Sequence, residues 1–516
     1  MPFSSSSTST LIAPEIVTLT NFIMPTPTTV DLVVEPYFNL PRPSEVRRDG
    51  PFLGWVKKHG NNLYGVHLSL EDLNTHIAIF GMTGSGKSTT ASVILSRLVE
   101  LGIKVLVIDW HNEYRNIVSH KNGLVFTPGK DVAPLTVNPL DPSLSGDLSE
   151  HMSLVTDIFT DIFNFTPPQG YMFREALRST YRRCGYFSEK PSLPPIVSDI
   201  VQEIERAPIR SAYDNETKLA LLRRLKPLTE GQAGKALNGQ TTIPIEDILS
   251  DIVSVELGHF KEQEIRKIFT SIFLKLLYDY RTKEKFSKLQ HVTIIEEARN
   301  IIPARRPEDP PSIGEKMISE LRKFGEGLVI ISQFPTQVSY EILKNAATRI
   351  CHQIKTEDDR KILQGAMKLT ERQASYLHYL KLGEAIVNMP LIPYAFPIYV
   401  ETESSILSQL SDDQLKNTMQ KRFYEYHIEI AEKPSQPPMA KLIMQTKLYQ
   451  LFKEYGSLTD DEIKTVVSTS EFYPIAVPIL NELSEKGIIK KELDEKTGQT
   501  RYTLIQTHLD EAQNTS

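Results

Sequence analysis

A glycine-rich stretch, IAIFGMTGSGKSTT at residues 77–90, carries residue types that bind phosphate. Its glycines allow backbone angles that turn several N–H groups toward one point, where an anion can bind. Lys87 is then placed to reach the β- and γ-phosphates, and the Ser88 hydroxyl to ligate Mg²⁺. The spacing predicts a nucleotide site, with an ordinary glycine turn as the alternative. The expected nucleotide contacts are Gly81, Thr83, Gly84, Ser85, Gly86, Lys87, Ser88 and Thr89.

Two adjacent carboxylates, Glu296 and Glu297, follow the apolar run HVTII. Phosphoryl transfer depends mainly on positioning and charge stabilisation, so one carboxylate can order the magnesium shell while the other polarises the attacking water. We expect Glu296 on the magnesium side, together with Ser88, and Glu297 as the base that activates water. Two acids that merely begin a solvated helix are the alternative.

Polar residues also follow two other apolar runs. VLVI precedes Asp109, His111 and Glu113, and GLVII precedes Ser332 and Gln333. Ligands of open α/β sheets bind at the carboxyl ends of the strands. We therefore expect Asp109 and Glu113 to border the nucleotide and Gln333 to sense its γ-phosphate. His111 has no companions at metal-ligand spacing, so a zinc site is not expected.

The elements that must position these residues are short apolar runs, typical of parallel strands covered on both faces by helices. HIAIF leads into the glycine loop, and the residues after the loop have the apolar spacing of a helix. Residues 54–70 alternate about a central turn, which predicts a hairpin. The fold class is therefore α/β. The other expected strands are KVLVIDW, GLVFTP, DIVSVEL, HVTIIEEA, GLVIISQ, RICHQI and EAIVNM.

Composition limits the class of protein. The chain has 516 residues, enough for two to four domains, and 24% charged and 40% hydrophobic residues, as in ordinary globular proteins. With a net charge of −6, any DNA contact must come from local basic patches or an assembled channel. The two cysteines predict no disulfide framework and favour a reducing cytoplasm. No apolar run reaches membrane-spanning length and the start does not resemble a signal peptide, so a soluble, cytoplasmic protein is expected.

Segments of different composition divide the chain. We expect helices in an insertion between strands, whose role is either a cap or a substrate contact. Near the end, three helical patterns and the hairpin IIKKEL–DEKTGQ–RYTLI have the layout of a winged helix, for DNA binding or protein docking. The expected parts are a flexible segment at 1–53, a nucleotide-binding core at 54–145 and 243–405, the helical insertion at 146–242, a helix and linker at 406–440, the winged-helix-like domain at 441–506 and a tail at 507–516.

The ordered motifs GMTGSGKS, VIDWHNEY, NPL, IIEEA, LRKFGEGLVIISQFP and LGEAIV resemble those of the HerA-like ATPases in the HerA and FtsK superfamily, over roughly residues 54–400. Members of that family are hexameric rings of RecA-like P-loop domains that use ATP to translocate double-stranded DNA. The resemblance implies a RecA-like core, ATP and Mg²⁺ as cofactors, duplex DNA as partner and a homo-hexamer. It also implies that Arg322 acts as an arginine finger at the subunit interface, with Lys323 and Arg349 as weaker candidates.

Three features depart from the family pattern. Asn112 replaces a glycine after the second strand, although asparagine tolerates left-handed backbone angles. Arg299 stands where histidine is common after the paired glutamates. The N-terminal β-barrel with which HerA recruits its nuclease is expected to be short or absent, so a nuclease or DNA-processing partner is an open question.

The function most strongly predicted is an ATP-hydrolysing, ring-forming motor that translocates or unwinds duplex DNA. A DNA transfer or packaging ATPase of a mobile element is an alternative within the same class. A nucleotide-gated DNA-binding regulator, with the winged helix as reader, is an alternative from another class, and a phosphotransferase with a small acceptor is the weakest.

Overall fold

The structure is a computed structural model that describes residues 35–401 except 49, 189–190, 285–287 and 306–311, then 410–419 and parts of 448–504. Internal contacts divide the chain into two compact units. Unit 1 consists of residues 1–102, 294–307 and 327–404, and unit 2 consists of residues 103–293, 308–326 and 405–516.

The sheet of unit 1 holds the glycine loop. Its strands follow the order β2-β1-β11-β10-β9-β3-β8. Parallel pairing surrounds β3, with Ile79 opposite Ile331 of β8 and Ile350 of β9. The expected hairpin is present as β1 and β2, and β9, β10, β11 and β1 pair antiparallel in turn. The strands are β1 (Phe52–Lys58), β2 (Asn61–His67), β3 (Ile77–Phe80), β8 (Glu326–Ser332), β9 (Thr348–Cys351), β10 (Glu384–Asn388) and β11 (Phe396–Tyr399).

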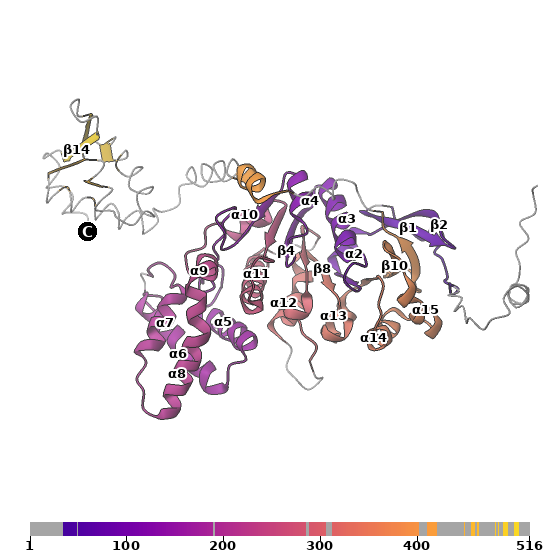
Figure 1. The fold of residues 1–516 in the computed structure, drawn as a ribbon, viewed down its shortest axis with the longest axis horizontal. Helices are drawn as coiled ribbons and strands as arrows, with labels where there is room; N and C mark the ends of the chain where they lie inside the picture. The colour runs from indigo at the N-terminus through magenta and orange to yellow at the C-terminus, as the bar shows by residue number, and fades with distance from the viewer. Residues whose placement is uncertain are drawn as a thin grey trace, which may run out of the picture. The chain divides into compact units, whose positions relative to one another are not determined.

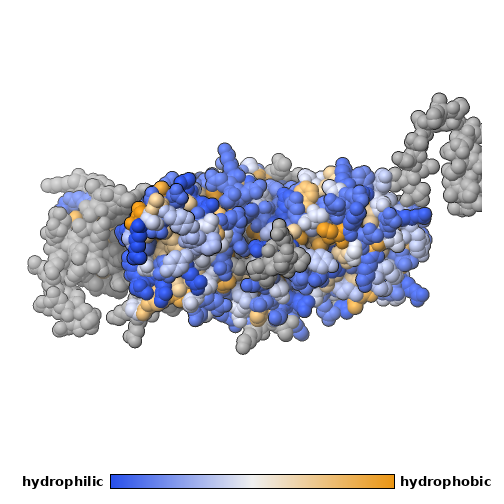
Figure 2. All heavy atoms as spheres, turned by 90° about the horizontal axis from the view of Figure 1, so that it is seen from below, coloured by the Kyte–Doolittle hydropathy of each residue, from blue (hydrophilic) through white to orange (hydrophobic). Residues whose placement is uncertain are grey.

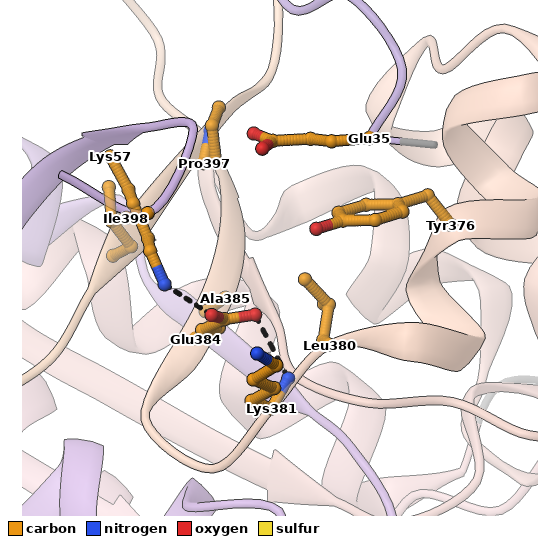
Figure 3. Close-up of a pocket in the computed structure, with 10 residues that line it drawn as sticks. Glu35, Lys57, Tyr376, Leu380, Lys381, Glu384, Ala385, Pro397 and Ile398 are labelled. Carbon is orange, nitrogen blue, oxygen red and sulfur yellow. Dashed lines mark hydrogen bonds and ion pairs between the residues drawn. The ribbon is translucent and has the colours of Figure 1, made fainter. Parts of the chain in front are cut away.

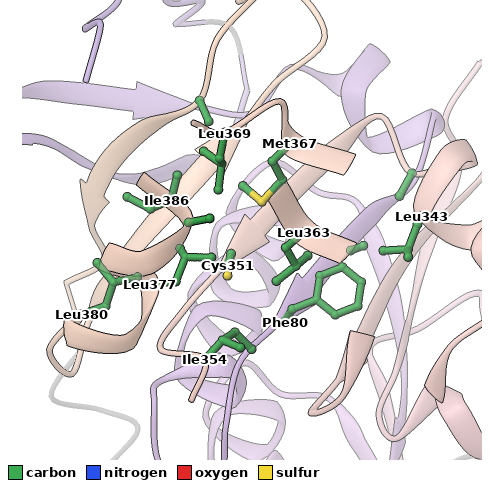
Figure 4. Close-up of a cluster of buried hydrophobic side chains, with 14 of the residues drawn as sticks. Phe80, Leu343, Cys351, Ile354, Leu363, Met367, Leu369, Leu377, Leu380 and Ile386 are labelled. Atoms are coloured by element: carbon green, nitrogen blue, oxygen red, sulfur yellow. The ribbon is translucent and has the colours of Figure 1, made fainter. Parts of the chain in front are cut away.

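A hydrophobic cluster supports β3 from one face (Figure 4). Phe80 and Cys351 point from β3 and β9 toward Leu363 of α14 and Leu377 beyond α15, all of them fully buried. Burying apolar side chains contributes about 1.5–3 kcal/mol each. The strand that leads into the glycine loop is therefore fixed by packing. The helices of unit 1 are α2 (Leu70–Asn74), α3 (Lys87–Glu100), α13 (Tyr340–Asn345), α14 (Glu357–Met367) and α15 (Glu371–Tyr376).

Unit 2 contains three parallel strands in the order β4-β6-β5 and a group of helices. Helices α5 to α8 lie together (Figure 1). Within this group the rings of Phe159 and Phe173 stack with their centroids 5.0 Å apart. The predicted helical patterns of this region are therefore confirmed. The elements are β4 (Lys104–Asp109), α4 (Arg115–His120), β5 (Leu124–Phe126), α5 (Leu148–Phe163), α6 (Pro167–Arg183), α7 (Val197–Arg206), α8 (Ala212–Leu225), α9 (Gly231–Leu237), α10 (Ile245–Leu249), β6 (Val253–Glu256), α11 (Gln263–Lys283) and α12 (Ile313–Leu321), while β7 (His291–Ile295) passes from unit 2 into unit 1.

The C-terminal part contains a separate three-stranded sheet in the order β12-β14-β13. The predicted hairpin is confirmed as β13 (Ile489–Leu493) and β14 (Thr500–Leu504), and β12 (Ser457–Thr459) pairs antiparallel with β14. The three expected helices, the linker and the first 34 residues lie wholly or largely outside the described residues. The winged helix therefore stays a prediction.

Hydrophilic residues dominate the face shown in Figure 2, with apolar residues in small groups among them. Scattered apolar residues of this kind are normal on protein surfaces. Within the described ranges, no helix combines the length and apolar character needed to cross a bilayer.

Candidate active site

The glycine loop connects β3 to α3 as the sequence predicts. Gly86 precedes the helix at φ 109°, a left-handed conformation that glycine adopts without strain. At Gly81 a side chain is excluded by space, because a Cβ there would lie 2.5 Å from Ser85 Oγ and 2.7 Å from the His352 Cβ. These two glycines allow the loop to fold tightly over the N-terminus of α3, an arrangement suited to anions.

Lys87 is buried at the first position of α3. Its Nζ donates to the Met82 carbonyl at 2.9 Å, and the Met82 N–H donates to the Gln353 carbonyl at 2.9 Å. The ammonium is thus held inside the loop, and the loop is tied to the end of β9. A phosphate entering the loop would therefore lie within reach of this ammonium.

Ser88 and Glu296 meet at the same edge of the sheet. The Ser88 hydroxyl lies 3.5 Å from Glu296 Oε1, and the Glu296 side chain is buried at the end of β7. A hydroxyl and a carboxylate are oxygen donors of the kind that Mg²⁺ prefers. The pair therefore fits the magnesium site expected from sequence.

Glu297 lies beside them in a left-handed conformation with φ 50° and ψ 42°. Its Oε1 accepts from Gln333 Nε2 and its Oε2 accepts from Arg299 Nε, each at 2.9 Å. Gln333 in turn accepts at 3.2 Å from the hydroxyl of Thr83 in the glycine loop. Non-glycine residues held at positive φ cost about 1–3 kcal/mol and cluster at functional sites. The structure thus brings the glycine loop, both glutamates and Gln333 together.

His352 packs against the glycine loop and α3, a role that was not predicted from the sequence. It is fully buried, with Nε2 2.8 Å from Thr90 Oγ1 of α3 and Nδ1 2.9 Å from the Glu384 carbonyl. Burial, despite the Glu384 hydrogen bond, lowers the pKa of His352 to about 4, so the ring is neutral near pH 7. The Glu384 carbonyl can only accept, so Nδ1 carries the proton and Nε2 accepts from Thr90. A histidine just past a buried strand was the only sequence signal for this contact.

A cavity of about 140 Å³, lined by polar and apolar side chains, lies beside the Glu384 side chain (Figure 3). The two carboxylate oxygens of Glu384 accept from the Lys57 ammonium and from the Lys381 N–H, with Tyr376 and Glu35 across the cavity. Burial, followed by the charges of Glu35 and Glu384, raises the pKa of Tyr376 to about 12, which keeps its hydroxyl protonated. These contacts fix the start of β10, whose carbonyl holds His352.

Comparisons with known proteins now bear on this site. Residues 52–277 match the family model for the central domain of helicase HerA. The predicted resemblance is confirmed. The chain is 25% identical over 335 residues to the DNA double-strand break repair helicase HerA of Sulfolobus acidocaldarius, covering 62% of this chain and 64% of the relative. The HerA helicase of Saccharolobus solfataricus is also 25% identical, over 339 residues, 62% of this chain and 63% of the relative. The chain thus spans a little under two thirds of these relatives.

Solved structures share the fold. VirB4 of Thermoanaerobacter pseudethanolicus superposes with a TM-score of 0.57 at 18% identity, covering 70% of this chain and all of the VirB4 chain. The bacterial conjugative coupling protein TrwB superposes with a TM-score of 0.52 at 12% identity, covering 71% of this chain and 92% of its own. The RecA-like P-loop fold expected from the HerA-like resemblance is therefore confirmed.

Asp109 and Glu113, the other expected nucleotide neighbours, lie in unit 2. The Asp109 carboxylate is fully buried and accepts three backbone N–H groups of the following loop, including that of Glu113 at 3.1 Å and that of Tyr114 at 3.0 Å. Burial raises the pKa of Asp109 to about 6 against the opposing effect of these hydrogen bonds. Glu113 is exposed. Asn112 adopts φ 61°, as its tolerance of left-handed angles predicted.

The three basic residues considered for a subunit interface differ in their surroundings. Arg322 and Lys323 are exposed in a short 3₁₀ turn of unit 2 directly after α12. Arg349 is engaged within its own chain, donating to the Leu343 carbonyl at 2.8 Å and to Asn388 Oδ1 at 3.3 Å. Of the three, Arg322 and Lys323 are the ones whose side chains are open to a neighbouring molecule.

Proposed function

We propose that this chain is an ATP-hydrolysing motor that moves double-stranded DNA and works as a ring of identical subunits. The convergence of the glycine loop, Ser88, Glu296, Glu297 and Gln333 at one sheet edge carries the proposal. The matched relatives are named as DNA double-strand break repair helicases. Because the chain spans less than two thirds of them, their activity and substrate are proposals for this chain.

In this proposal the glycine loop holds the phosphates of ATP. Lys87 exchanges the Met82 carbonyl for the β- and γ-phosphates, and the N–H groups of Gly84, Gly86 and Ser88 surround them. Ser88 and Glu296 would hold Mg²⁺, which would supply neutralisation of the charge on the transferring phosphoryl group. The nucleotide is thereby fixed with its γ-phosphate toward Glu297 and Gln333.

Glu297 is proposed as the base. Its carboxylate orients a water and accepts its proton as the water oxygen bonds to the γ-phosphorus and the bond to the bridging oxygen breaks, giving ADP and phosphate. Gln333 lies between the glycine loop and this carboxylate, so it is placed to sense whether a γ-phosphate is present. Both groups act by position, which is the main contribution of a protein to phosphoryl transfer.

Ring assembly would place a basic residue of one subunit at the site of the next. Arg322 is the candidate, because its guanidinium is exposed and an arginine at the transferring phosphoryl group stabilises the developing charge. A net charge of −6 is compatible with DNA movement if only the residues that line the channel are basic. A nuclease or other DNA-processing partner and a cytoplasmic location remain predictions of the sequence.

DNA transfer between cells is the second candidate. The structures that share this fold include VirB4 and the plasmid coupling protein TrwB, one of them with a non-hydrolysable ATP analogue at a TM-score of 0.51. Identities of 12–18% carry the fold alone. Both candidates share the chemistry at Glu297 and differ in the cellular pathway that supplies the DNA.

The test is ATP turnover by the wild type and by Glu297→Gln, each alone, with single-stranded DNA and with linear duplex. We expect duplex to stimulate the wild type and Glu297→Gln to bind ATP without turning it over. Lys87→Ala serves as the matched variant that loses nucleotide binding instead. Slow turnover that is indifferent to DNA would contradict the motor and favour a nucleotide-gated regulator, and a monomer in the presence of DNA and an ATP analogue would exclude the ring.

A further inference from the structure

The base proposed above is held on both of its oxygens. Glu297 Oε2 accepts from Arg299 Nε and Oε1 from Gln333 Nε2, each at 2.9 Å, and the Glu297 side chain is only 7% exposed. A carboxylate in this state is committed to two protein donors. An attacking water must compete with them for the same oxygens.

Arg299 is itself fixed from two further directions. Its Nη1 donates to Gln337 Oε1 at 2.7 Å, and its guanidinium carbon lies 5.0 Å from the centre of the Phe334 ring. A guanidinium is planar, permanently charged and well suited to bonding a carboxylate while it stacks on an aromatic ring. The same side chain therefore joins Glu297 to residues 334 and 337.

One short segment, residues 333–337, supplies both sides of this arrangement. Gln333 at its start holds Oε1 of Glu297, while Phe334 and Gln337 hold the arginine on Oε2. The segment includes the 3₁₀ turn η4 (Pro335–Gln337). A shift of this one segment would therefore loosen both partners of the carboxylate together.

The segment is also joined to the glycine loop. The Thr83 hydroxyl donates to Gln333 Oε1 at 3.2 Å. Thr83 lies inside the loop proposed to surround the phosphates, so a bound γ-phosphate and its magnesium would compete for both side chains. Losing this hydrogen bond frees the side-chain oxygen of Gln333 and so loosens the start of the segment.

We propose that Arg299 is a positioning residue that latches Glu297 in a resting state, and that nucleotide and DNA binding release it through Thr83, Gln333 and the segment 333–337. The proposal rests on the proposed ATPase function and describes its regulation. Arg299 moves no proton: it stays charged, gives up its bond to Glu297 Oε2 and leaves that oxygen to accept from water. Basal hydrolysis is thereby kept low until substrate is engaged.

The test compares steady-state ATP turnover of full-length Arg299→Ala and wild type, with and without saturating linear duplex. We expect the variant to raise kcat without DNA roughly fivefold, the rate equivalent of losing one partly exposed ion pair, with KM for ATP unchanged. The ratio of DNA-stimulated to basal turnover should fall by a similar factor. Arg372→Ala, an exposed arginine on α15, is the matched control and should behave as the wild type.

Two further variants separate a latch from a structural role. Gln337→Ala leaves the Glu297 contacts in place but removes one support of Arg299, so a smaller rise in basal kcat is expected. Arg299→Lys keeps the charge but is too short to join Glu297 and Gln337, so basal kcat should also rise. The double variant Arg299→Ala, Glu297→Gln should be inactive, which would show that the added turnover passes through Glu297.

A fall in kcat for Arg299→Ala, with normal ATP affinity and an unchanged unfolding midpoint, would overturn the latch and make Arg299 an activator of Glu297. Unchanged basal turnover in Arg299→Ala and Gln337→Ala would also overturn it. If Arg299→Ala does not fold, Gln337→Ala and Arg299→Lys decide by the same criterion. Failure of the proposed function is seen separately, as wild-type turnover that is absent or independent of Glu297.

Discussion

Two buried glutamates of this protein are each paired with an arginine, but the two arginines differ in how exposed they are. Glu326, in unit 2 at the start of β8, accepts from Arg281 Nε at 2.9 Å, His291 Nδ1 at 2.8 Å and Thr293 Oγ1 at 2.7 Å. The side chains of Arg281 and Glu326 are 6% and 0% exposed. Glu297, in unit 1, pairs with Arg299, whose side chain is 30% exposed.

The two glutamates differ in whether water or a ligand can replace their hydrogen-bond partners. Burial alone would raise the pKa of Glu326, but the charge and hydrogen bond of His291, then the charge of Arg281, hold that pKa below its ordinary value. No water can replace these buried partners, so the group is structural. Of the partners of Glu297, Gln333 lies in the segment 333–337 that contacts the glycine loop, and Arg299 is partly exposed and held by that segment, so the proposed latch can exchange both. A buried carboxylate is therefore a functional candidate when its partners are replaceable, and not merely because it is buried.

The largest effect expected from this comparison is on catalysis at Glu297. Glu297→Gln should lower ATP turnover by at least about a hundredfold, because a positioned base contributes that much or more to proton transfer. The free energy of unfolding should change little, since glutamine keeps the size of the side chain and one acceptor oxygen, and Arg299, whose side chain is 30% exposed, can bond to water instead. Turnover and urea unfolding of the same preparation measure the two quantities, and a variant with most of its activity would remove Glu297 from the role of base.

The opposite result is expected at Glu326, where a substitution should reduce stability and leave ATP binding in place. Glu326→Gln leaves the buried guanidinium of Arg281 without a counter-charge, which should lower the free energy of unfolding by about 3 kcal/mol. ATP affinity should survive at temperatures where the variant is folded. Urea unfolding measures the loss, and Glu384→Gln is a useful comparison because that carboxylate is less buried. A stable variant that lost turnover would reverse the assignment of the two glutamates.

A buried group with no charged partner gives a different response to pH. His352 has a pKa lowered to about 4 by burial, below the ordinary 6.5, so the unfolded chain binds the proton more readily. Stability must therefore fall as pH drops from 6.5 toward 4, by roughly 2 kcal/mol between pH 7 and pH 5. His352→Gln keeps a donor for Glu384 and an acceptor for Thr90 but cannot titrate. Urea unfolding at the two pH values should show the wild type losing that much more free energy of unfolding than the variant. Equal losses in both proteins would contradict the role assigned to His352.

The smallest change in stability is expected at ion pairs outside the core, beginning with a partly buried one. Lys57 and Glu384 are 19% and 10% exposed, and Lys57→Met keeps the aliphatic stem while removing the charge. A pair of this kind contributes about 1 kcal/mol, more than a solvent-exposed pair. Lys361→Met, at a solvent-exposed pair with Glu357, should change the free energy of unfolding less than Lys57→Met does. Equal changes in the free energy of unfolding for the two variants would show that burial does not determine how much these ion pairs contribute.

Much of this arrangement was predictable from sequence because it is local. The glycine spacing before Lys87 and the apolar runs of β3, β7 and β8 specify where a strand ends and which polar residue follows it. Since parallel strands end at one edge, the approach of Ser88, Glu296 and Gln333 followed from topology alone. The hairpin of β1 and β2 followed from its alternation in the same way.

The rest depends on long-range contacts that leave no local pattern. The pairing of Arg299 with Glu297 requires a left-handed backbone at Glu297 and a glutamine 38 residues away at Gln337. His352 acquires its role only through Glu384 on the next strand. Neither β11 nor the antiparallel pairing of β10 with β9 was predicted from the sequence pattern. The place of Asp109 beside the nucleotide stays a prediction, and its three hydrogen bonds to its own loop were not predicted.

The position of β3 in its sheet has a consequence for synthesis of the chain. β3 ends at residue 80, but the strands on either side of it begin at residues 326 and 348. At about 5–20 residues per second, the ribosome needs roughly 12 to 50 seconds to make the intervening chain. The glycine loop therefore emerges long before the strands that fix it. A nascent chain cannot form this nucleotide site until most of the protein has been made, which leaves the apolar residues of β3 dependent on chaperones or local collapse during that interval.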